Sequence, residues 1–219
     1  MKIPFTTSEF LNVFEQYNKA IWPLQVIFYA MAIFSVFSIV RKGLYTNIIA
    51  FSFLGFFWIW MGVVYHLIFF SEINQAAIVF GVAFIAQGLV FLYFGADRQK
   101  IKLELVRDAT GISGVVFIVY ALILYPLLGL FLGHVYPAAP TFGVPCPTTI
   151  FTFGILLFSR ERVPWYVVII PFLWSLIGFF AAIHLSTPQD FGLVGAGVVS
   201  TLIVVFFKPK RRFETGMAV

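Results

Sequence analysis

The sequence predicts an all-α membrane protein, a bundle of seven transmembrane helices, and three observations support this. Hydrophobic residues make up 61% of the 219 residues and charged residues only 11%, whereas a soluble domain carries about 25% charged residues. Seven long apolar segments contain no Asp, Glu, Lys or Arg. The basic residues between these segments fall almost entirely on one side of the predicted membrane. Lipid is therefore the expected solvent of this chain.

The seven segments differ in how well they fit a bilayer, since about 20 apolar residues are needed to cross the hydrocarbon core. Five of them reach that length, and the seventh lies at the short limit. The fifth is too short to cross the bilayer by itself. Either the Pro-rich segment before it completes the crossing, or the end of this helix lies inside protein. The predicted spans are Ile21–Val40, Ile48–Phe70, Ala76–Gly95, Ala109–Gly133, Thr148–Ser159, Val163–Leu185 and Phe191–Phe207.

The positions of the basic residues predict the orientation, because cytoplasmic loops are enriched in Lys and Arg. Only Lys2 and Lys19 fall on the other side. This pattern predicts a multi-pass protein with its N-terminus outside and a basic cytoplasmic tail, residues 208–219. The net charge of +5 is thus a topology signal, and nucleic acid is not an expected partner. The twelve residues on the cytoplasmic side are Arg41, Lys42, Arg98, Lys100, Lys102, Arg107, Arg160, Arg162, Lys208, Lys210, Arg211 and Arg212.

Residues 1–20 form a separate segment ahead of the predicted bundle, residues 21–207. Thr6 and Glu9 have the spacing of a helix capping box, and apolar residues then recur at helical intervals. This pattern predicts a short amphipathic helix on the outer membrane surface. An extension of the first span, packed on the bundle, is the alternative.

Spans 2–3 and 6–7 share an order of features that is typical of an internal repeat. His66 is followed after six residues by Glu72, and His184 after six residues by Asp190. Each acidic residue precedes an apolar span and then a basic cluster. The pattern predicts a 3+1+3 parallel repeat, a layout found in some small-solute transporters. Coincidence is the competing interpretation, because aromatic residues gather at membrane interfaces in any membrane protein.

Six potential metal ligands or proton carriers map to the outer ends of the spans. Imidazole, thiolate and carboxylate groups are the ligand set of zinc and copper. No HxxxH or CxxC motif occurs, so such a site would have to be assembled from separate helices. Haem held by two of the histidines is a further alternative, and amphipathic interface histidines are the plain one. The six residues are His66, His134, Cys146, His184, Glu72 and Asp190.

The stretch from 134 to 147 is rich in proline and glycine, which exclude a regular helix over most of it. It is apolar and uncharged, so it is expected to fold back into the outer mouth of the bundle as a re-entrant or lid segment. Cys146 lies near its end, close to the start of a span, where a helix N-terminus favours the thiolate. A rigid plug with Cys146 as small apolar filling is the alternative.

Aromatic side chains are a second candidate for ligand binding. Trp58, Gly62, Tyr65 and Phe69 share one face of the second span in a regular α-helix. Such a face is able to form a wall of a binding site, although packing against protein or lipid is the commoner use. The candidate ligand-binding residues are Trp58, Trp60, Tyr65 and Trp174.

Missing motifs narrow the function. The chain has no GxxxxGK[ST], HExxH or GxSxG motif, which argues against ATP hydrolysis and the commoner hydrolase mechanisms. We therefore expect an outward-facing site that binds or transports a small solute or transition metal. A membrane-embedded metal-dependent hydrolase, with Glu72 or Asp190 as general base, is one alternative. A non-catalytic sensor or partner subunit is another, and a second copy of the chain remains open as a partner.

Two strings carry a resemblance to known proteins. FFWIWMGVVYHLIFF, Phe56–Phe70, and GHVYPAAPTFGVPCPTTIFTFG, Gly133–Gly154, together with the opening around Phe5–Pro23, resemble an uncharacterised family of bacterial integral membrane proteins. The Pro-Cys-Pro-Thr-Thr string is the most specific part. The resemblance implies a bacterial inner-membrane setting and no particular activity, so it assigns a role to no residue.

Overall fold

The computed structural model describes residues 4–97, 101–185 and 187–209, and every regular element in these ranges is a helix. Six of the expected spans are helices long and apolar enough to cross a membrane. The chain is therefore an all-helical, multi-pass membrane protein by length and composition. Its elements are α1 (Thr7–Ile21), α2 (Leu24–Arg41), α3 (Thr46–Trp60), η1 (Met61–Phe69), η2 (Phe70–Glu72), α4 (Ala77–Ala96), α5 (Ala109–Val119), η3 (Tyr120–Leu124), α6 (Tyr125–Phe131), α7 (Pro145–Leu157), α8 (Trp165–Leu185), η4 (Pro188–Asp190), α9 (Phe191–Leu202) and η5 (Ile203–Phe207).

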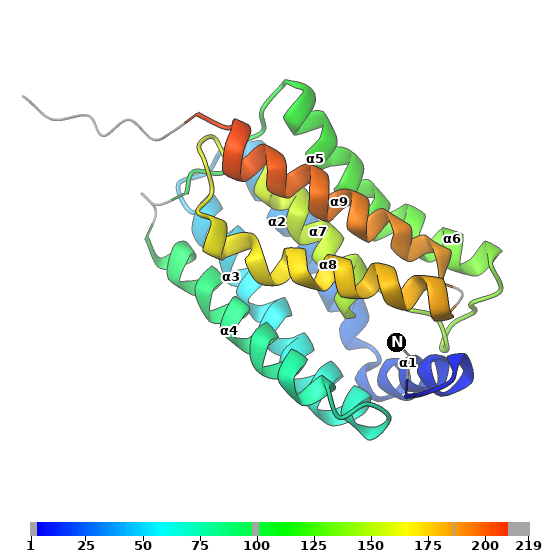
Figure 1. Ribbon diagram of the computed structural model, residues 1–219. Coiled ribbons are helices and arrows are strands. Elements are labelled where there is room, and N and C mark those ends of the chain that lie inside the picture. Colours follow the sequence, from blue (N-terminus) through cyan, green and yellow to red (C-terminus); the bar gives the residue numbers. More distant parts are fainter. Residues whose placement is uncertain (1–3, 98–100, 186, 210–219) are drawn as a thin grey trace, which may run out of the picture.

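The short fifth segment is α7, and it lies along the middle of the bundle (Figure 1). Its 13 residues measure about 20 Å, less than the roughly 30 Å of a hydrocarbon core. All of them except Cys146 are buried, and the helix contacts α3, α5, α8 and α9. Because protein surrounds it, α7 does not have to match the thickness of the bilayer.

The first turn of α7 has few backbone donors to satisfy. A helix start leaves its first N–H groups without intrahelical acceptors, and Pro145 and Pro147 carry no N–H. The Thr148 hydroxyl accepts a hydrogen bond from the Gly143 N–H at 3.0 Å, which fixes the incoming chain. The Pro-Cys-Pro-Thr string is thus a way to begin a helix inside protein.

The last turn of α7 is capped by a lysine from the far end of the chain. The Lys208 ammonium is buried and donates to the carbonyl oxygens of Leu157, at 3.0 Å, and Ser159, at 2.5 Å. A cation at a helix C-terminus also interacts favourably with the helix dipole. Arg162 donates from Nε to the Lys208 carbonyl at 2.7 Å and so holds the same segment. Burial lowers the pKa of Lys208.

Helix α3 and its π-helical continuation η1 pack closely and antiparallel against α4. A Cβ atom added at Gly62 would lie 2.7 Å from the Gly81 carbonyl oxygen, and one added at Gly88 would lie 2.8 Å from the Gly55 carbonyl oxygen. Glycine is therefore needed at these crossings so that the two backbones can approach. Figure 1 shows this pair beside α8 and α2.

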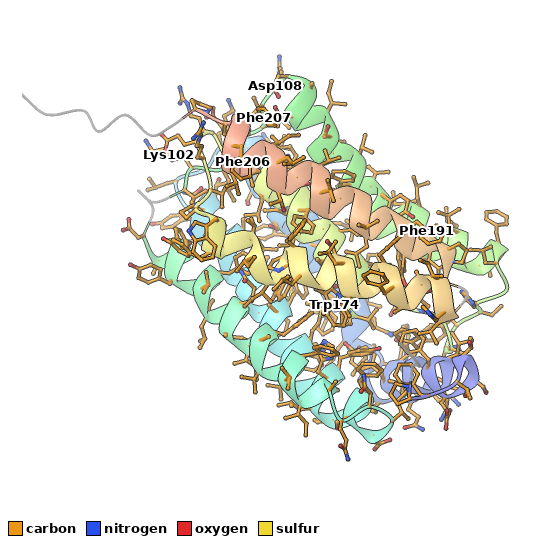
Figure 2. The ribbon with its side chains drawn as sticks, viewed as in Figure 1. Lys102, Asp108, Trp174, Phe191, Phe206 and Phe207 are labelled. Atoms are coloured by element: carbon orange, nitrogen blue, oxygen red, sulfur yellow. The ribbon has the colours of Figure 1, made fainter. Side chains whose placement is uncertain are left out.

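The molecule has a basic end and an opposite end, here called the α1 end after the helix that covers it (Figure 1). The Asn47 amide binds the backbone of Ile101 and Leu103, and the Glu104 N–H donates to the Phe158 carbonyl oxygen. Figure 2 shows Lys102, Asp108, Phe206 and Phe207 gathered at the basic end. The described members of the predicted cytoplasmic set belong to this end: Arg41, Lys42, Lys102, Arg107, Arg160, Arg162 and Lys208. Arg98, Lys100, Lys210, Arg211 and Arg212 lie outside the described residues.

The expected capping box starts α1, with the Thr6 hydroxyl accepting from the Glu9 N–H at 3.2 Å. Helix α1 ends before Pro23, so it is separate from α2. Its buried face contacts the bundle, with the Phe14 and Tyr17 rings against Tyr65. The structure thus combines the two expectations, a separate helix whose apolar face packs on protein.

The segment between α6 and α7 folds over the α1 end and is held there by Asn18. The Asn18 amide donates to the carbonyl oxygens of Pro137, at 2.7 Å, and Ala139, at 2.8 Å. Its own oxygen accepts from Gln25 and from the Thr141 hydroxyl. Within this segment Phe142 and Val144 are fully buried. The expected lid is therefore an ordered cap, tied to α1 and α2, while its last three residues already belong to α7.

The Lys208 cap leads to a stability prediction. Lys208→Met removes two charge-assisted hydrogen bonds and leaves the buried carbonyl oxygens of Leu157 and Ser159 without donors. We expect a loss of about 2 kcal/mol in unfolding free energy, measured by denaturation in detergent micelles. The matched control is Lys102→Met at an exposed position of the same end. Equal stability of the two variants would contradict the cap.

Candidate functional site

Two π-helical segments bring polar side chains into the bundle at the α1 end. A π-helix has a wider turn than an α-helix, and short π segments occur frequently at functional sites. In η1 the consecutive residues Tyr65 and His66 are both buried. In η3 and the start of α6, Tyr120 and Tyr125 are five residues apart, and both hydroxyls reach the turn η4. These irregular helices therefore position much of the candidate site.

His66 is completely buried in a box of aromatic rings. Its ring centroid lies 4.6 Å from that of Phe84, 5.1 Å from Trp174 and 5.2 Å from Tyr65. Neither ring nitrogen has a hydrogen-bond partner among the described residues. A neutral imidazole offers one donor and one acceptor, and buried polar atoms of this kind are normally paired. His66 thus has unused hydrogen-bonding capacity inside the protein.

Trp174 lies next to His66 and also beside Cys146. Figure 2 shows Trp174 about midway along α8, and the residue is 8% exposed. Its indole N–H is near the Cys146 sulfur, which is only a weak acceptor, and it has no regular acceptor among the described residues. Cys146 is the one residue of α7 that keeps some exposure. An indole donor without a strong acceptor therefore lies beside the thiol of Cys146.

Asp190 is the second polar neighbour of Cys146, besides Trp174. Its carboxylate neighbours the thiol and accepts hydrogen bonds from the Tyr125 hydroxyl, at 2.5 Å, and the Thr187 hydroxyl, at 3.0 Å. The carboxylate is 4% exposed. We call these neighbouring groups the buried polar cluster: Tyr65, His66, Tyr125, Cys146, Trp174, Thr187 and Asp190.

Only part of the six-residue ligand set comes together. Cys146 and Asp190 are neighbours. His66 contacts Trp174, which in turn lies beside Cys146. Among residues 4–97, 101–185 and 187–209, no three His, Cys, Asp or Glu side chains are arranged to hold a metal ion. The six predicted ligands are thus not assembled into a zinc or copper site within the ranges that the structure describes.

The remaining three members of that set lie apart for local reasons. Glu72 is exposed in the turn before α4. His184 is exposed, and its Nδ1 contacts the Phe180 carbonyl oxygen one turn earlier at 2.8 Å. His134 Nδ1 lies 3.2 Å from the Gln189 amide nitrogen, and burial lowers the pKa of His134.

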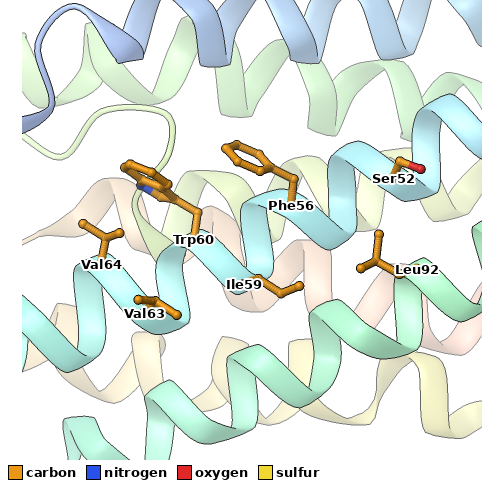
Figure 3. Close-up of a pocket in the computed structure, with 7 residues that line it drawn as sticks. All are labelled: Ser52, Phe56, Ile59, Trp60, Val63, Val64 and Leu92. Atoms are coloured by element: carbon orange, nitrogen blue, oxygen red, sulfur yellow. The ribbon is translucent and has the colours of Figure 1, made fainter.

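The four candidate ligand-binding aromatic residues lie in three different environments. Trp58 is buried and donates to the Thr152 hydroxyl at 3.0 Å. Trp60 donates to the Tyr17 hydroxyl at 2.9 Å and lines an apolar groove of about 450 Å³ (Figure 3). Of the four candidates, only Tyr65 and Trp174 belong to the buried polar cluster. The change to π-helix at Met61 shifts the faces that a regular α-helix would have aligned.

Sequence reasoning missed Tyr125 and Thr187. Tyr125 lies within an apolar span, where a hydroxyl group needs a hydrogen-bond partner. This feature could have marked Tyr125 as a candidate site residue. Its partner Asp190 is 65 residues away, so spacing along the chain gave no pairing. Thr187 follows α8 and lies three positions before Asp190, which is the spacing of a local turn contact.

What the cluster can do chemically follows from its atoms. It offers an unused imidazole, an unused indole donor, a thiol and a carboxylate around the start of α7. This set is able to donate to and accept from a small molecule. The described residues do not provide the three converging ligands of a catalytic zinc site.

Comparison with known proteins gives one match. Residues 7–217 match the profile of a family described as a family of unknown function, DUF6064. No curated protein and no solved structure matches the chain.

The Tyr125–Asp190 pair can be tested by its effect on stability. Tyr125→Phe leaves one carboxylate oxygen of buried Asp190 without its phenol donor, so we expect a loss of about 1–3 kcal/mol in unfolding free energy. Tyr166→Phe, which removes a hydroxyl from an exposed tyrosine, serves as the control. Denaturation of both variants in detergent is the measurement, and an unchanged Tyr125→Phe stability would refute the pairing.

Proposed function

Since the chain belongs to the DUF6064 family, whose description states no activity, we propose a function from the geometry alone. The protein binds a small hydrogen-bonding solute in the buried polar cluster and receives it from outside the cell. Transport of that solute would be an extension of the same binding step. The proposal narrows the expected solute-or-metal site to the solute, because no three metal-ligating side chains converge among the described residues.

One observation carries the proposal. The His66 ring and the Trp174 indole N–H are buried, lie side by side, and have no regular hydrogen-bond partner in the described part of the chain. A buried polar atom without a partner costs about 1–3 kcal/mol. A small solute that accepts from the indole and bonds to the imidazole would remove this cost. Cys146, partly exposed beside Trp174, marks the approach.

The direction of access rests on the proposed topology. We propose seven crossings with α7 as the fifth, the N-terminus outside and the basic end in the cytoplasm of a bacterial cell. The gathering of the described basic residues at one end supports this orientation. The buried polar cluster then lies in the outer half of the membrane, below the cap formed by α1 and the segment after α6.

The 3+1+3 repeat stays a prediction. What supports it is that α3–α4 and α8–α9 are both neighbouring helix pairs in which a glycine contacts the partner helix, at Gly55 and at Gly197. His66 and His184, the histidines that the repeat would relate, are buried and exposed respectively. The solute proposal does not depend on the repeat.

Cysteine labelling tests the topology. In a Cys146→Ser background, Val135→Cys and Arg160→Cys place thiols at exposed positions on either side of α7. We expect a membrane-impermeant maleimide to label Val135→Cys in intact cells and Arg160→Cys only after permeabilisation. Labelling of both from one side would show that α7 is not a crossing, and the reverse pattern would invert the orientation.

Protection of the native thiol tests solute binding. Cys146 is the only cysteine, so the small neutral reagent methyl methanethiosulfonate reports on this position alone. We expect at least one of urea, methanol, acetate or methylammonium to slow the reaction several-fold, and His66→Leu to abolish that protection. His184→Leu, at an exposed histidine, should keep it. A thiol that never reacts from the outer side, or that no solute protects, would contradict the proposal.

A further inference from the structure

Asp190 is the only buried carboxylate among the described residues. The groups around it are neutral donors: the hydroxyls of Tyr125 and Thr187 and the thiol of Cys146. Hydrogen bonds of this kind stabilise a carboxylate but leave its charge uncompensated. Buried charges in proteins are normally paired with an opposite charge, and within a membrane an acidic side chain usually has a partner or a role.

No described cationic side chain is placed to pair with Asp190. The described lysines and arginines belong to the basic end, apart from Lys19, which is exposed on α1 and paired with Glu15. Two histidines are near it: His66 belongs to the same cluster, and His134 contacts the neighbouring residue Gln189. Burial lowers the pKa of His134, which favours the neutral ring. The negative charge of the cluster is therefore unmatched within the described protein.

The remaining surroundings of Asp190 are aromatic. The Tyr125 hydroxyl donates to its carboxylate, and the Tyr120 hydroxyl donates to the carbonyl oxygen of the preceding residue, Gln189. Trp174 lies on the other side of Cys146. Aromatic faces attract organic cations, and indole and phenol rings do so best. A hard metal cation would instead need about six oxygen ligands, which a cluster built mainly of rings does not offer.

We infer that the solute bound at the buried polar cluster is a small organic cation of the alkylammonium class, with the Asp190 carboxylate as its counter-charge. The inference rests on the proposed function, because it names the solute class of the same site. The aromatic rings enclose the carbon atoms and the positive charge. His66 supplies a neutral acceptor for an ammonium N–H.

Two charged thiol reagents of similar size test this inference at Cys146. Aminoethyl methanethiosulfonate is a cation and sulfonatoethyl methanethiosulfonate is an anion, and each adds its group to the thiol by releasing the same sulfinate. We expect the cation-to-anion rate ratio, relative to a free thiol in solution, to be at least about tenfold higher in the wild-type protein than in Asp190→Asn. Any change in intrinsic thiol reactivity affects both reagents equally and cancels in the ratio.

Three controls make the result specific. Glu72→Gln removes an exposed carboxylate at the same end and should leave the ratio unchanged, while Asp190→Glu should restore it. If Asp190→Asn does not fold, the inference is tested on the wild-type protein instead. Methylammonium is then expected to slow the reaction of Cys146 with methyl methanethiosulfonate several-fold more than methanol does at the same concentration.

The outcomes separate the inference from the proposed function. Equal rates for the two reagents, or equal protection by methylammonium and methanol, would overturn the cation while leaving a solute site. A thiol unreactive toward cationic, anionic and neutral reagents alike would overturn the solute site itself. Protection that follows pH but no amine would overturn the alkylammonium assignment and leave Asp190 as a proton-binding group.

Discussion

The structure depends on one constraint, that a short central helix must have all of its backbone polar groups satisfied inside protein. Helix α7 is short and lies almost wholly inside the protein, so the backbone groups at its ends need protein partners. At its start, proline removes donors that would otherwise be unpaired, and at its end the Lys208 ammonium donates to the buried carbonyl oxygens of Leu157 and Ser159. The surrounding helices then need only pack against an apolar rod.

The same constraint explains the position of the buried polar cluster. Cys146, in the first turn of α7, is the one residue of this helix that is not fully buried. The neighbouring helices are irregular, since η1 carries Tyr65 and His66 and Tyr125 directly follows η3. Polar side chains inside a membrane protein must find protein partners or a bound molecule. Tyr125 and Asp190 are hydrogen-bonded to each other, whereas the ring nitrogens of His66 and Trp174 have no hydrogen-bond partner among the described residues.

Much of the fold was predictable because hydropathy does not depend on distant contacts. Local sequence correctly predicted six of the seven charge-free segments as helices able to span a membrane, and the capping box at Thr6 and Glu9. The site was less accessible. A π-helix arises from packing between helices, so the faces of Trp58 and Tyr65 were assigned as if the helix were regular. Lys208 was read only as a topology signal, since its long side chain reaches back to α7 across about fifty residues of sequence.

The cap on α7 also has a consequence for biogenesis. A ribosome delivers α7 well before Lys208, which follows the last helix, η5. Until that lysine emerges, the carbonyl oxygens of Leu157 and Ser159 have no ammonium donor, and α8 and α9 are not yet present to cover the helix. The central helix is thus the last part of the bundle to be completed. During membrane insertion, α7 must therefore stay beside α5, or within the translocation machinery, while the following segments are synthesised.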